Sequence, residues 1–337
     1  SSRPATPMSA AEERPRVFIT QPVSQTAIWK LQAVAEVTWN PDPLHIVTKT
    51  ELIEAVKKHD YLFCLLHDTI DAELIAANPN LKVIASMAII PAGIDVQAAT
   101  ARRIPVTVIP PMVTEATADL HWALLLAVAR RVVEADRLLR AGTFPGGQSA
   151  YLEGRGVSGK TLGIIGCGRI GQALARRARG FGMRLLYYER TPLTPEEERA
   201  LGLCYVSLNQ LLEEADFVSV SCAFTSETRH LISGPELARM KPTAGLINTS
   251  RGPVVDETAL VKALRERRIA GAALDVFEHE PRVAPELIGF PNVVLTPHIG
   301  SADAELREQM ALIVAENILA VIHGRRPPNC ANPEIYG

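Results

Sequence analysis

The stretch that decides the fold is TLGIIGCGRIG, residues 161–171. Its first five residues form an apolar run typical of a buried strand, and its last six have the spacing GxGxxG. A helix is expected to begin at the last of these glycines, and Glu189 stands 18 residues beyond it, at the end of a second apolar run. A strand, this glycine spacing, a helix and a later acidic residue together predict a dinucleotide-binding unit.

Each residue of the glycine motif has a physical task in such a unit. Gly166 permits the tight turn, Gly168 lets the backbone approach a pyrophosphate, and Gly171 allows close packing of helix on strand. Arg169 and Ile170 directly precede the expected helix, whose unpaired N-terminal amide groups attract phosphates. A glycine-rich turn without a ligand is the alternative, and the flanking strand and helix argue against it.

Two adjacent residues bear on the choice of dinucleotide. The carboxylate of Glu189 is expected to accept hydrogen bonds from the adenosine ribose and to repel a 2′-phosphate, which favours NAD. The guanidinium of Arg190 could instead pair with that phosphate, or lie free on the surface. NAD is therefore the predicted cofactor, and NADP stays open.

Outward from this motif, strand-like and helix-like segments alternate along the chain. Continuous apolar strands separated by helices predict parallel sheets covered on both faces, so we expect two doubly wound α/β units in series. One long helix is predicted from 114 to 141, with Thr114 as its N-cap. The expected strands cover 17–20, 36–39, 61–66, 81–87, 106–109, 161–165, 184–188, 217–221, 245–248, 272–276 and 293–295.

Length and composition narrow the class of protein. The 337 residues suffice for about two domains. The net charge of −2 gives no basic field for nucleic acid or an anionic membrane, and no apolar run reaches the ~18 residues of a membrane span. Five cysteines without a CxxC pair favour a reduced, cytoplasmic protein with no metal site.

Three charged residues follow strands of the second unit: Arg251, Glu280 and His298. Ligands of doubly wound sheets bind at the carboxyl ends of the strands, so the three are expected at the dinucleotide edge. Histidine donates protons near neutral pH, a carboxylate orients it, and arginine polarises a carbonyl. This set suits hydride transfer to a 2-oxo acid; three unrelated loop residues are the alternative. His121 is expected to be packed or at an interface, and His230 shows no pattern of partners.

The chain resembles the D-isomer-specific 2-hydroxyacid dehydrogenases, the family of glyoxylate/hydroxypyruvate reductase, D-lactate, phosphoglycerate and phosphite dehydrogenases. The likeness runs from about residue 16 to 330. The stretches that carry it are TEATADLHWALLLAVARR (114–131), GKTLGIIGCGRIGQALARR (159–177), MKPTAGLINTSRGPVVDETAL (240–260), GAALDVFEHEP (271–281) and VVLTPHIGSA (293–302).

The resemblance implies a particular architecture. A Rossmann dinucleotide-binding domain, 113–302, is inserted into a flavodoxin-like substrate domain, 15–112 and 303–337, and residues 1–14 are a flexible arm. It also implies a homodimer built around the helix matching 115–141, and a small 2-oxo or 2-hydroxy acid as substrate.

The resemblance further assigns roles to residues. Arg251 binds and polarises the substrate, Glu280 pairs with the histidine, and His298 is the acid/base. Asp275 matches a residue near the nicotinamide carboxamide. The predicted cofactor-binding residues are Gly166, Gly168, Arg169, Ile170, Gly171, Glu189, Arg190, Cys222, Thr228, Thr249, Asp275, His298 and Gly300.

One loop departs from the family. Its substrate-binding pattern A-V-G-x-D-N-I-D is replaced by AIIPAGID, in which Ala88, Ile89 and Ile90 match the positions that hold the substrate carboxylate. Ile90 stands where the family has glycine, and Pro91 has no N–H, so the loop must take another shape. Either the two isoleucines line the pocket and favour an apolar or larger 2-oxo acid over glyoxylate, or Ile90 packs inward and the amides of Ala88 and Ile89 donate as usual.

Two other functions remain open at this stage. A phosphite dehydrogenase shares the fold and the triad, but it carries a lysine where this chain has Ile89, so an anionic inorganic substrate would lose a cation. A NAD-sensing interaction module, like the co-repressors of this fold, also keeps the triad. A formate dehydrogenase is disfavoured because it has glutamine in place of Glu280.

Overall fold

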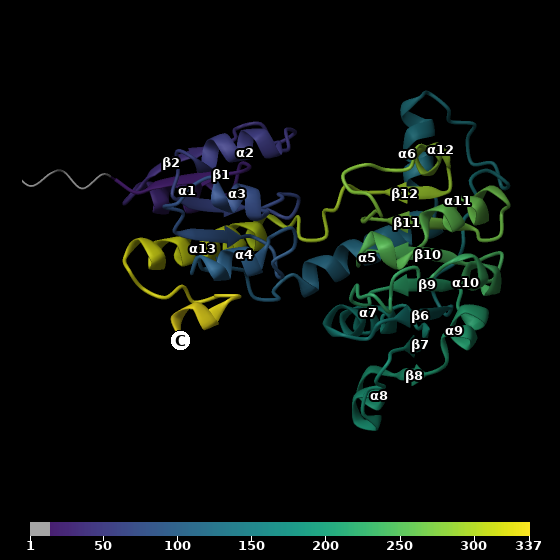
Figure 1. The fold of residues 1–337 in the computed structure, drawn as a ribbon. Coiled ribbons are helices and arrows are strands. Elements are labelled where there is room, and N and C mark those ends of the chain that lie inside the picture. The colour runs from purple at the N-terminus through teal and green to yellow at the C-terminus, as the bar shows by residue number, and fades with distance from the viewer. Residues whose placement is uncertain (1–13) are drawn as a thin grey trace, which may run out of the picture. The chain divides into compact units, whose positions relative to one another are not determined.

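The computed structural model describes residues 14–337, which form two compact units (Figure 1). One unit comprises residues 14–112 together with 303–337, and the other comprises 113–302. The flexible arm predicted for residues 1–14 falls outside the described residues except for Arg14.

The first unit is a five-stranded, wholly parallel sheet in the order β2-β1-β3-β4-β5. Helix α1 packs against the C-terminal helix α13, which also contacts β4 and β3. This order is the doubly wound, flavodoxin-like one that was predicted. The elements are β1 (Arg16–Ile19), α1 (Gln25–Gln32), β2 (Glu36–Trp39), α2 (Lys49–Val56), β3 (Tyr61–Cys64), α3 (Ala72–Ala76), β4 (Val83–Ser86), α4 (Val96–Ala101), β5 (Val106–Thr107), α13 (Ala304–Ile322) and the 3-10 turn η2 (Pro333–Tyr336).

The second unit is a seven-stranded parallel sheet in the order β12-β11-β10-β9-β6-β7-β8. The chain runs outward from β6 to β8 and then returns to β9 on the other side of β6, so the switch point lies between β6 and β9. This strand order confirms the predicted Rossmann arrangement of the unit. The elements are α5 (Thr114–Ala129), α6 (Val132–Arg140), β6 (Thr161–Ile165), α7 (Arg169–Arg179), β7 (Arg184–Tyr188), α8 (Pro195–Leu201), β8 (Leu203–Tyr205), α9 (Leu208–Glu214), β9 (Phe217–Val220), α10 (Gly234–Arg239), β10 (Gly245–Asn248), the 3-10 turn η1 (Gly252–Val254), α11 (Glu257–Arg265), β11 (Gly271–Leu274), α12 (Pro285–Gly289) and β12 (Val293–Leu295).

Successive residues of the central strands serve the two faces of this sheet in turn. Phe217 and Ile247 pack beneath helices α5 and α7, whereas Val218 and Leu246 belong to the opposite cluster, under α10 and α11. Side chains alternate across a strand, so a strand buried on both sides must be apolar throughout. This requirement explains the continuous apolar runs from which the strands were predicted.

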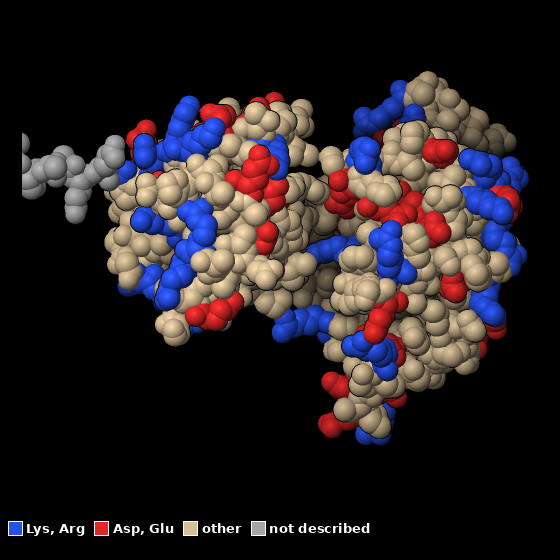
Figure 2. Space-filling view, viewed as in Figure 1, with Lys and Arg blue, Asp and Glu red and all other residues tan. Residues whose placement is uncertain are grey.

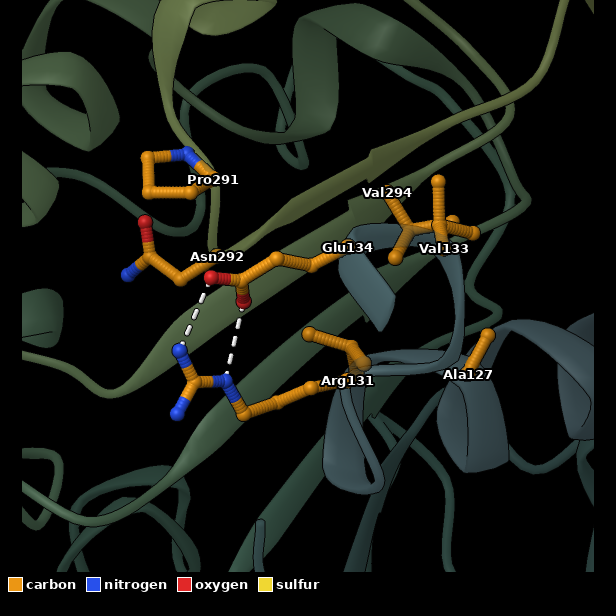
Figure 3. Close-up of a pocket in the computed structure, with 8 residues that line it drawn as sticks. Ala127, Arg131, Val133, Glu134, Pro291, Asn292 and Val294 are labelled. Carbon is orange, nitrogen blue, oxygen red and sulfur yellow. Dashed lines mark hydrogen bonds and ion pairs between the residues drawn. The ribbon is translucent and has the colours of Figure 1, made fainter. Parts of the chain in front are cut away.

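The prediction of one long helix over 114–141 is wrong, because the structure has two helices there. Arg131 takes a left-handed conformation, with φ of 55°, and ends α5 before α6 begins. The carbonyl of Ala129 accepts the amide of Arg155 at 2.7 Å, and the Arg131 guanidinium makes a two-pronged ion pair with Glu134 at 2.9 and 2.8 Å (Figure 3). The predicted N-cap Thr114 is also corrected: Val113 occupies that position and Thr114 is the first helical residue.

The surface carries charges of both signs. Figure 2 shows acidic and basic side chains interspersed over the face that it draws. Among the described residues, no helix combines the length and the apolar character that crossing a bilayer requires.

Candidate active site

The loops that flank the switch point touch through their backbones. Gly166 follows β6 with φ of +88°, and a Cβ there would lie 2.3 Å from the Cα of Cys222, which follows β9. The hydroxyl of Ser221 donates to the Gly166 carbonyl at 2.6 Å. The segment Ser221-Cys222 therefore closes against the glycine loop, and only glycine fits at position 166.

The rest of the glycine motif leaves room for a pyrophosphate. A Cβ at Gly171 would meet the Gly166 carbonyl oxygen at 2.3 Å, so helix α7 approaches the strand closely. A Cβ at Gly168 would meet nothing within 4 Å, and α7 begins at the next residue, Arg169. The first turn of a helix presents unpaired N–H groups, so open space and donors coincide where a dinucleotide phosphate fits.

Glu189 closes this site from the end of β7. Its carboxylate accepts the amide of Cys167, inside the glycine motif, at 2.8 Å and that of Arg190 at 3.1 Å. The neighbouring Arg190 side chain is exposed and pairs with Glu227 at 2.8 Å. A carboxylate thus lies at the glycine loop, while the guanidinium that could receive a 2′-phosphate is engaged with another acid.

A buried carboxylate shapes the turn that carries His298. Asp275, after β11, accepts hydrogen bonds from the Thr296 hydroxyl at 2.6 Å and from the amides of Ile299 and Gly300 at 2.8 and 2.9 Å. Burial raises the pKa of Asp275, and these three donors oppose that effect. Within this turn His298 adopts a left-handed conformation, with φ of 54°.

His298 and Glu280 form the pair expected from the sequence. The Nδ1 atom of His298 lies 2.8 Å from Oε2 of Glu280, and the other oxygen of Glu280 accepts the amide of Phe277 at 3.0 Å. Both side chains remain about one-fifth exposed, at 20% and 18%. A carboxylate at Nδ1 requires a proton on that nitrogen, so Nε2 is the nitrogen at which a ligand can exchange a proton.

Arg251 supplies a guanidinium at the same sheet edge. It follows β10, where the side chain of Asn248 accepts the Ser250 amide at 3.0 Å and donates to the Arg251 carbonyl at 3.1 Å. The guanidinium donates to the Ser250 carbonyl at 2.7 Å. Burial lowers the pKa of Arg251 and the Glu280 carboxylate raises it, so the charge stands in a partly desolvated site near that acid.

Sequence reasoning missed the environment of His121. This residue of α5 is fully buried, with Nδ1 2.7 Å from the Thr249 hydroxyl and Nε2 2.6 Å from the Ser219 hydroxyl. Burial lowers its pKa to about 3, so the ring is neutral at physiological pH. His121 therefore ties a predicted cofactor-binding residue, Thr249, to the interior of the sheet.

Two other predicted cofactor-binding residues use their polar groups within the protein. The Thr228 hydroxyl donates to the Ala223 carbonyl at 2.8 Å, and the Gly300 amide donates to Asp275. The loops of both residues follow carboxyl ends of strands of the seven-stranded sheet. Their contact with a cofactor stays a prediction.

The departing loop of the first unit, residues 88–95, keeps Ile90 out of the left-handed region. Positive φ occurs at Gly93 and not at Ile90, whose side chain is 49% exposed and does not pack inward. The Ala88 amide donates to the Ser86 hydroxyl oxygen at 3.2 Å. Among the described residues, no group accepts a hydrogen bond from the amide of Ile89 or of Ile90. Both N–H groups are therefore available to an anion.

Comparison with known proteins agrees with this geometry. Residues 122–300 match the model of the D-isomer specific 2-hydroxyacid dehydrogenase, NAD binding domain. A glyoxylate reductase of Thermococcus litoralis is 49% identical over 96% of this chain and 98% of its own. A crystal structure of a Thermus thermophilus protein has a TM-score of 0.85 and 43% identity, covering 94% and 99% of the two chains. An NADPH-dependent glyoxylate/hydroxypyruvate reductase of Sinorhizobium meliloti, 32% identical, has a TM-score of 0.75 over 94% and 97%.

The buried histidine predicts an acid-sensitive stability. Because the folded pKa of His121, about 3, lies below that of an unfolded histidine, its contribution is complete above about pH 6.5 and declines as the pH falls. We expect His121→Gln to be less stable at pH 7 but to lose up to about 1.4 kcal/mol less per pH unit than wild type between pH 6 and 4. Urea denaturation at each pH measures this difference.

The matched control is His59→Gln, since His59 is only half-buried and its Nδ1–H donates to the Ala55 carbonyl at 2.7 Å. Its acid dependence should parallel that of wild type. Parallel curves for His121→Gln and wild type would show that His121 does not titrate between the two states.

Proposed function

The chain belongs to the family of D-isomer specific 2-hydroxyacid dehydrogenases, and we propose that it works as a reductase of small 2-oxo acids through Arg251, Glu280 and His298. It is an NAD(P)-dependent oxidoreductase that transfers a hydride between NAD(H) and a 2-hydroxy or 2-oxo acid. The observation that carries the proposal is the 2.8 Å contact between His298 and Glu280 at the carboxyl edge of the dinucleotide-binding sheet.

The histidine–carboxylate pair supplies the proton. When bound, NADH would supply the hydride for C2 of the oxo acid, and the carbonyl oxygen would gain a proton in the same reaction. His298 donates it from Nε2, while Glu280 at Nδ1 stabilises the imidazolium and fixes the plane of the ring. In the oxidation direction the same nitrogen accepts the proton.

Anionic substrate binding rests on two sets of donors. Arg251 has N–H groups beyond the one bound to Ser250, and it polarises the carbonyl of the substrate. The amides of Ile89 and Ile90 bind the substrate carboxylate, and their lack of partners among the described residues supports this role. The Ala88 amide, bound to Ser86, is a weaker candidate than the sequence suggested.

The cofactor is NAD in this proposal. The Glu189 carboxylate at the glycine loop suits free ribose hydroxyls, and Arg190, the cation that could receive a 2′-phosphate, pairs with Glu227. The Sinorhizobium meliloti relative is NADPH-dependent, so use of NADP at lower efficiency fits the family.

The substrate is a 2-oxo acid with an apolar side chain, in preference to glyoxylate. Similar proteins of high identity are called glyoxylate reductases, so glyoxylate is expected to react. Ile90, in place of the small residue of the family pattern, offers an exposed apolar surface next to the amides that bind the carboxylate. A longer substrate side chain gains free energy by covering that surface.

Assembly and location complete the proposal. Helix α6 has no buried residue and exposes Val132 and Leu139. The segment after it exposes Phe144, whose exposed fraction is 77%. Apolar side chains gathered in this way favour a homodimer. The five cysteines are unpaired, which suits the reducing cytoplasm.

Removing the proposed acid should abolish most turnover. We expect His298→Asn to lower kcat for 2-oxo acid reduction by about 100-fold or more, because general acid catalysis contributes about 10²–10⁴. Glu280→Gln should lower kcat by about 10-fold or more, since the imidazolium loses the anion that stabilises and orients it. NADH oxidation followed by absorbance between pH 5 and 9 measures both. Wild-type rates in His298→Asn, with His59→Asn as control, would contradict the assignment.

Cofactor choice should depend on Glu189. We expect Glu189→Ala to weaken NADH use by about 10-fold while leaving NADPH use unchanged or improved, because a charge-assisted hydrogen bond contributes about 1.5–3 kcal/mol and a 2′-phosphate is no longer repelled. The ratio of kcat/KM for the two cofactors, at a fixed oxo acid, reports the effect. An unchanged ratio would place the ribose elsewhere.

Substrate preference should depend on Ile90. Glyoxylate, pyruvate and 4-methyl-2-oxopentanoate form a series of increasing side-chain size, and we expect kcat/KM to rise along it. Ile90→Gly should lower the ratio of the largest acid to glyoxylate by about 10-fold, as removal of apolar contact of about 1.5 kcal/mol implies. If wild type prefers glyoxylate, or if the ratio is unchanged in Ile90→Gly, the specificity proposal fails while the reductase proposal stands.

A further inference from the structure

Three loops at the carboxyl edge of the seven-stranded sheet are joined to one another. They follow β9, β10 and β11, and the second and third carry Arg251 and Glu280. The first two pair through backbone: the amide of His230 donates to Pro253 at 2.8 Å, and Ile232 and Val255 form a parallel bridge. The position of the second loop is therefore coupled to that of the first.

The second and third loops interlock through two glutamates. The amide of Glu278 donates to the Glu257 carboxylate at 2.6 Å, and the amide of Glu257 donates to the Glu278 carboxylate at 3.0 Å. A Cβ at Gly252 would lie 1.9 Å from the Phe277 carbonyl, so the backbones touch directly beside Arg251. The two carboxylates repel each other, and together with burial this repulsion raises the pKa of Glu257.

His230 completes the connection between the first and third loops. Its Nε2 lies 2.5 Å from the remaining oxygen of Glu278, and its Nδ1 lies 3.9 Å from Asp256. The Glu278 side chain is only 9% exposed, whereas His230 is 34% exposed. His230 takes a left-handed backbone conformation, with φ of 51°, which residues other than glycine adopt uncommonly.

We propose that His230 is a positioning residue for the reduction: by binding Glu278 it holds the segment Phe277–Glu280, and so keeps Glu280 against His298. Glu280 lies two positions after Glu278, and the amide of Phe277, directly before Glu278, binds the Glu280 carboxylate at 3.0 Å. Without the His230 donor, the nearly buried Glu278 carboxylate faces Glu257 with one oxygen unpaired. The Glu278 carboxylate then rotates toward water, and this rotation displaces the segment Phe277–Glu280.

The alternative is that His230 only stabilises the fold. The inference rests on the proposed reductase function, because Glu280 matters only if His298 exchanges the proton. A structural role lowers the melting temperature alone, whereas a positioning role also lowers kcat and alters its pH dependence. The two are separated by comparing variants that share the same backbone strain.

The experiment compares His230→Ala with His230→Gln. Both place a Cβ at the left-handed position, but only glutamine can offer an N–H to Glu278 at the reach of Nε2. Relative to wild type with NADH and its best 2-oxo acid, we expect His230→Ala to lower kcat about 10- to 100-fold. The pH dependence of kcat should also differ from that of wild type, with KM for NADH changed less than about 3-fold. His230→Gln should recover kcat to within about 3-fold of wild type.

Controls and contrary outcomes are defined by the same measurements. His59→Ala, at the amino end of β3, should leave kcat and the pH profile unchanged. If His230→Ala and His230→Gln have equal kcat, or if His230→Ala loses thermal stability with kcat and pH profile intact, the positioning role is overturned. If wild type reduces no 2-oxo acid, the proposed function itself fails, and thermal melting still shows whether both variants are folded.

Discussion

The proposed catalytic edge depends on one buried carboxylate, Asp275. Its two oxygens bind a hydroxyl and two amides of the turn at 296–300, so the turn cannot relax without leaving a desolvated charge unpaired. This constraint holds His298 in a left-handed conformation, which residues other than glycine adopt uncommonly. The turn therefore fixes the position of the imidazole, and the Glu280 carboxylate binds it there at Nδ1.

Close backbone approaches perform the same task for the other loops. Gly166 lies against Cys222 and Gly252 lies against Phe277, each at a distance that excludes a Cβ. These contacts join neighbouring loops at the carboxyl edge of the sheet without relying on flexible side chains. A site on loops gains in this way the rigidity that catalysis requires of its donors.

The sequence predicted what depends on local pattern and failed where the partners are distant. The strands at 36–39 and 161–165 match the structure because the first contains β-branched and aromatic residues and the second an apolar run. The break at Arg131 was missed because its cause, the Arg155 amide at the Ala129 carbonyl, comes from another segment. His121 was expected to be packed, as it is, but its partners and those of His230 could not be predicted because they lie 128, 98 and 48 residues away. Strand β8, exposed at the sheet edge, lacked the apolar run that marked the others.

Two histidines of this unit show how environment separates structure from chemistry. His121 bonds to two neutral hydroxyls, those of Thr249 and Ser219, and burial keeps it neutral at physiological pH. His298 has a carboxylate at one nitrogen, and its side chain stays partly exposed. Only the second arrangement lets an imidazole alternate between charged and neutral forms at small cost, which a proton donor must do in each turnover. The same residue type thus serves as a fixed support in the sheet interior and as a proton carrier at the sheet edge.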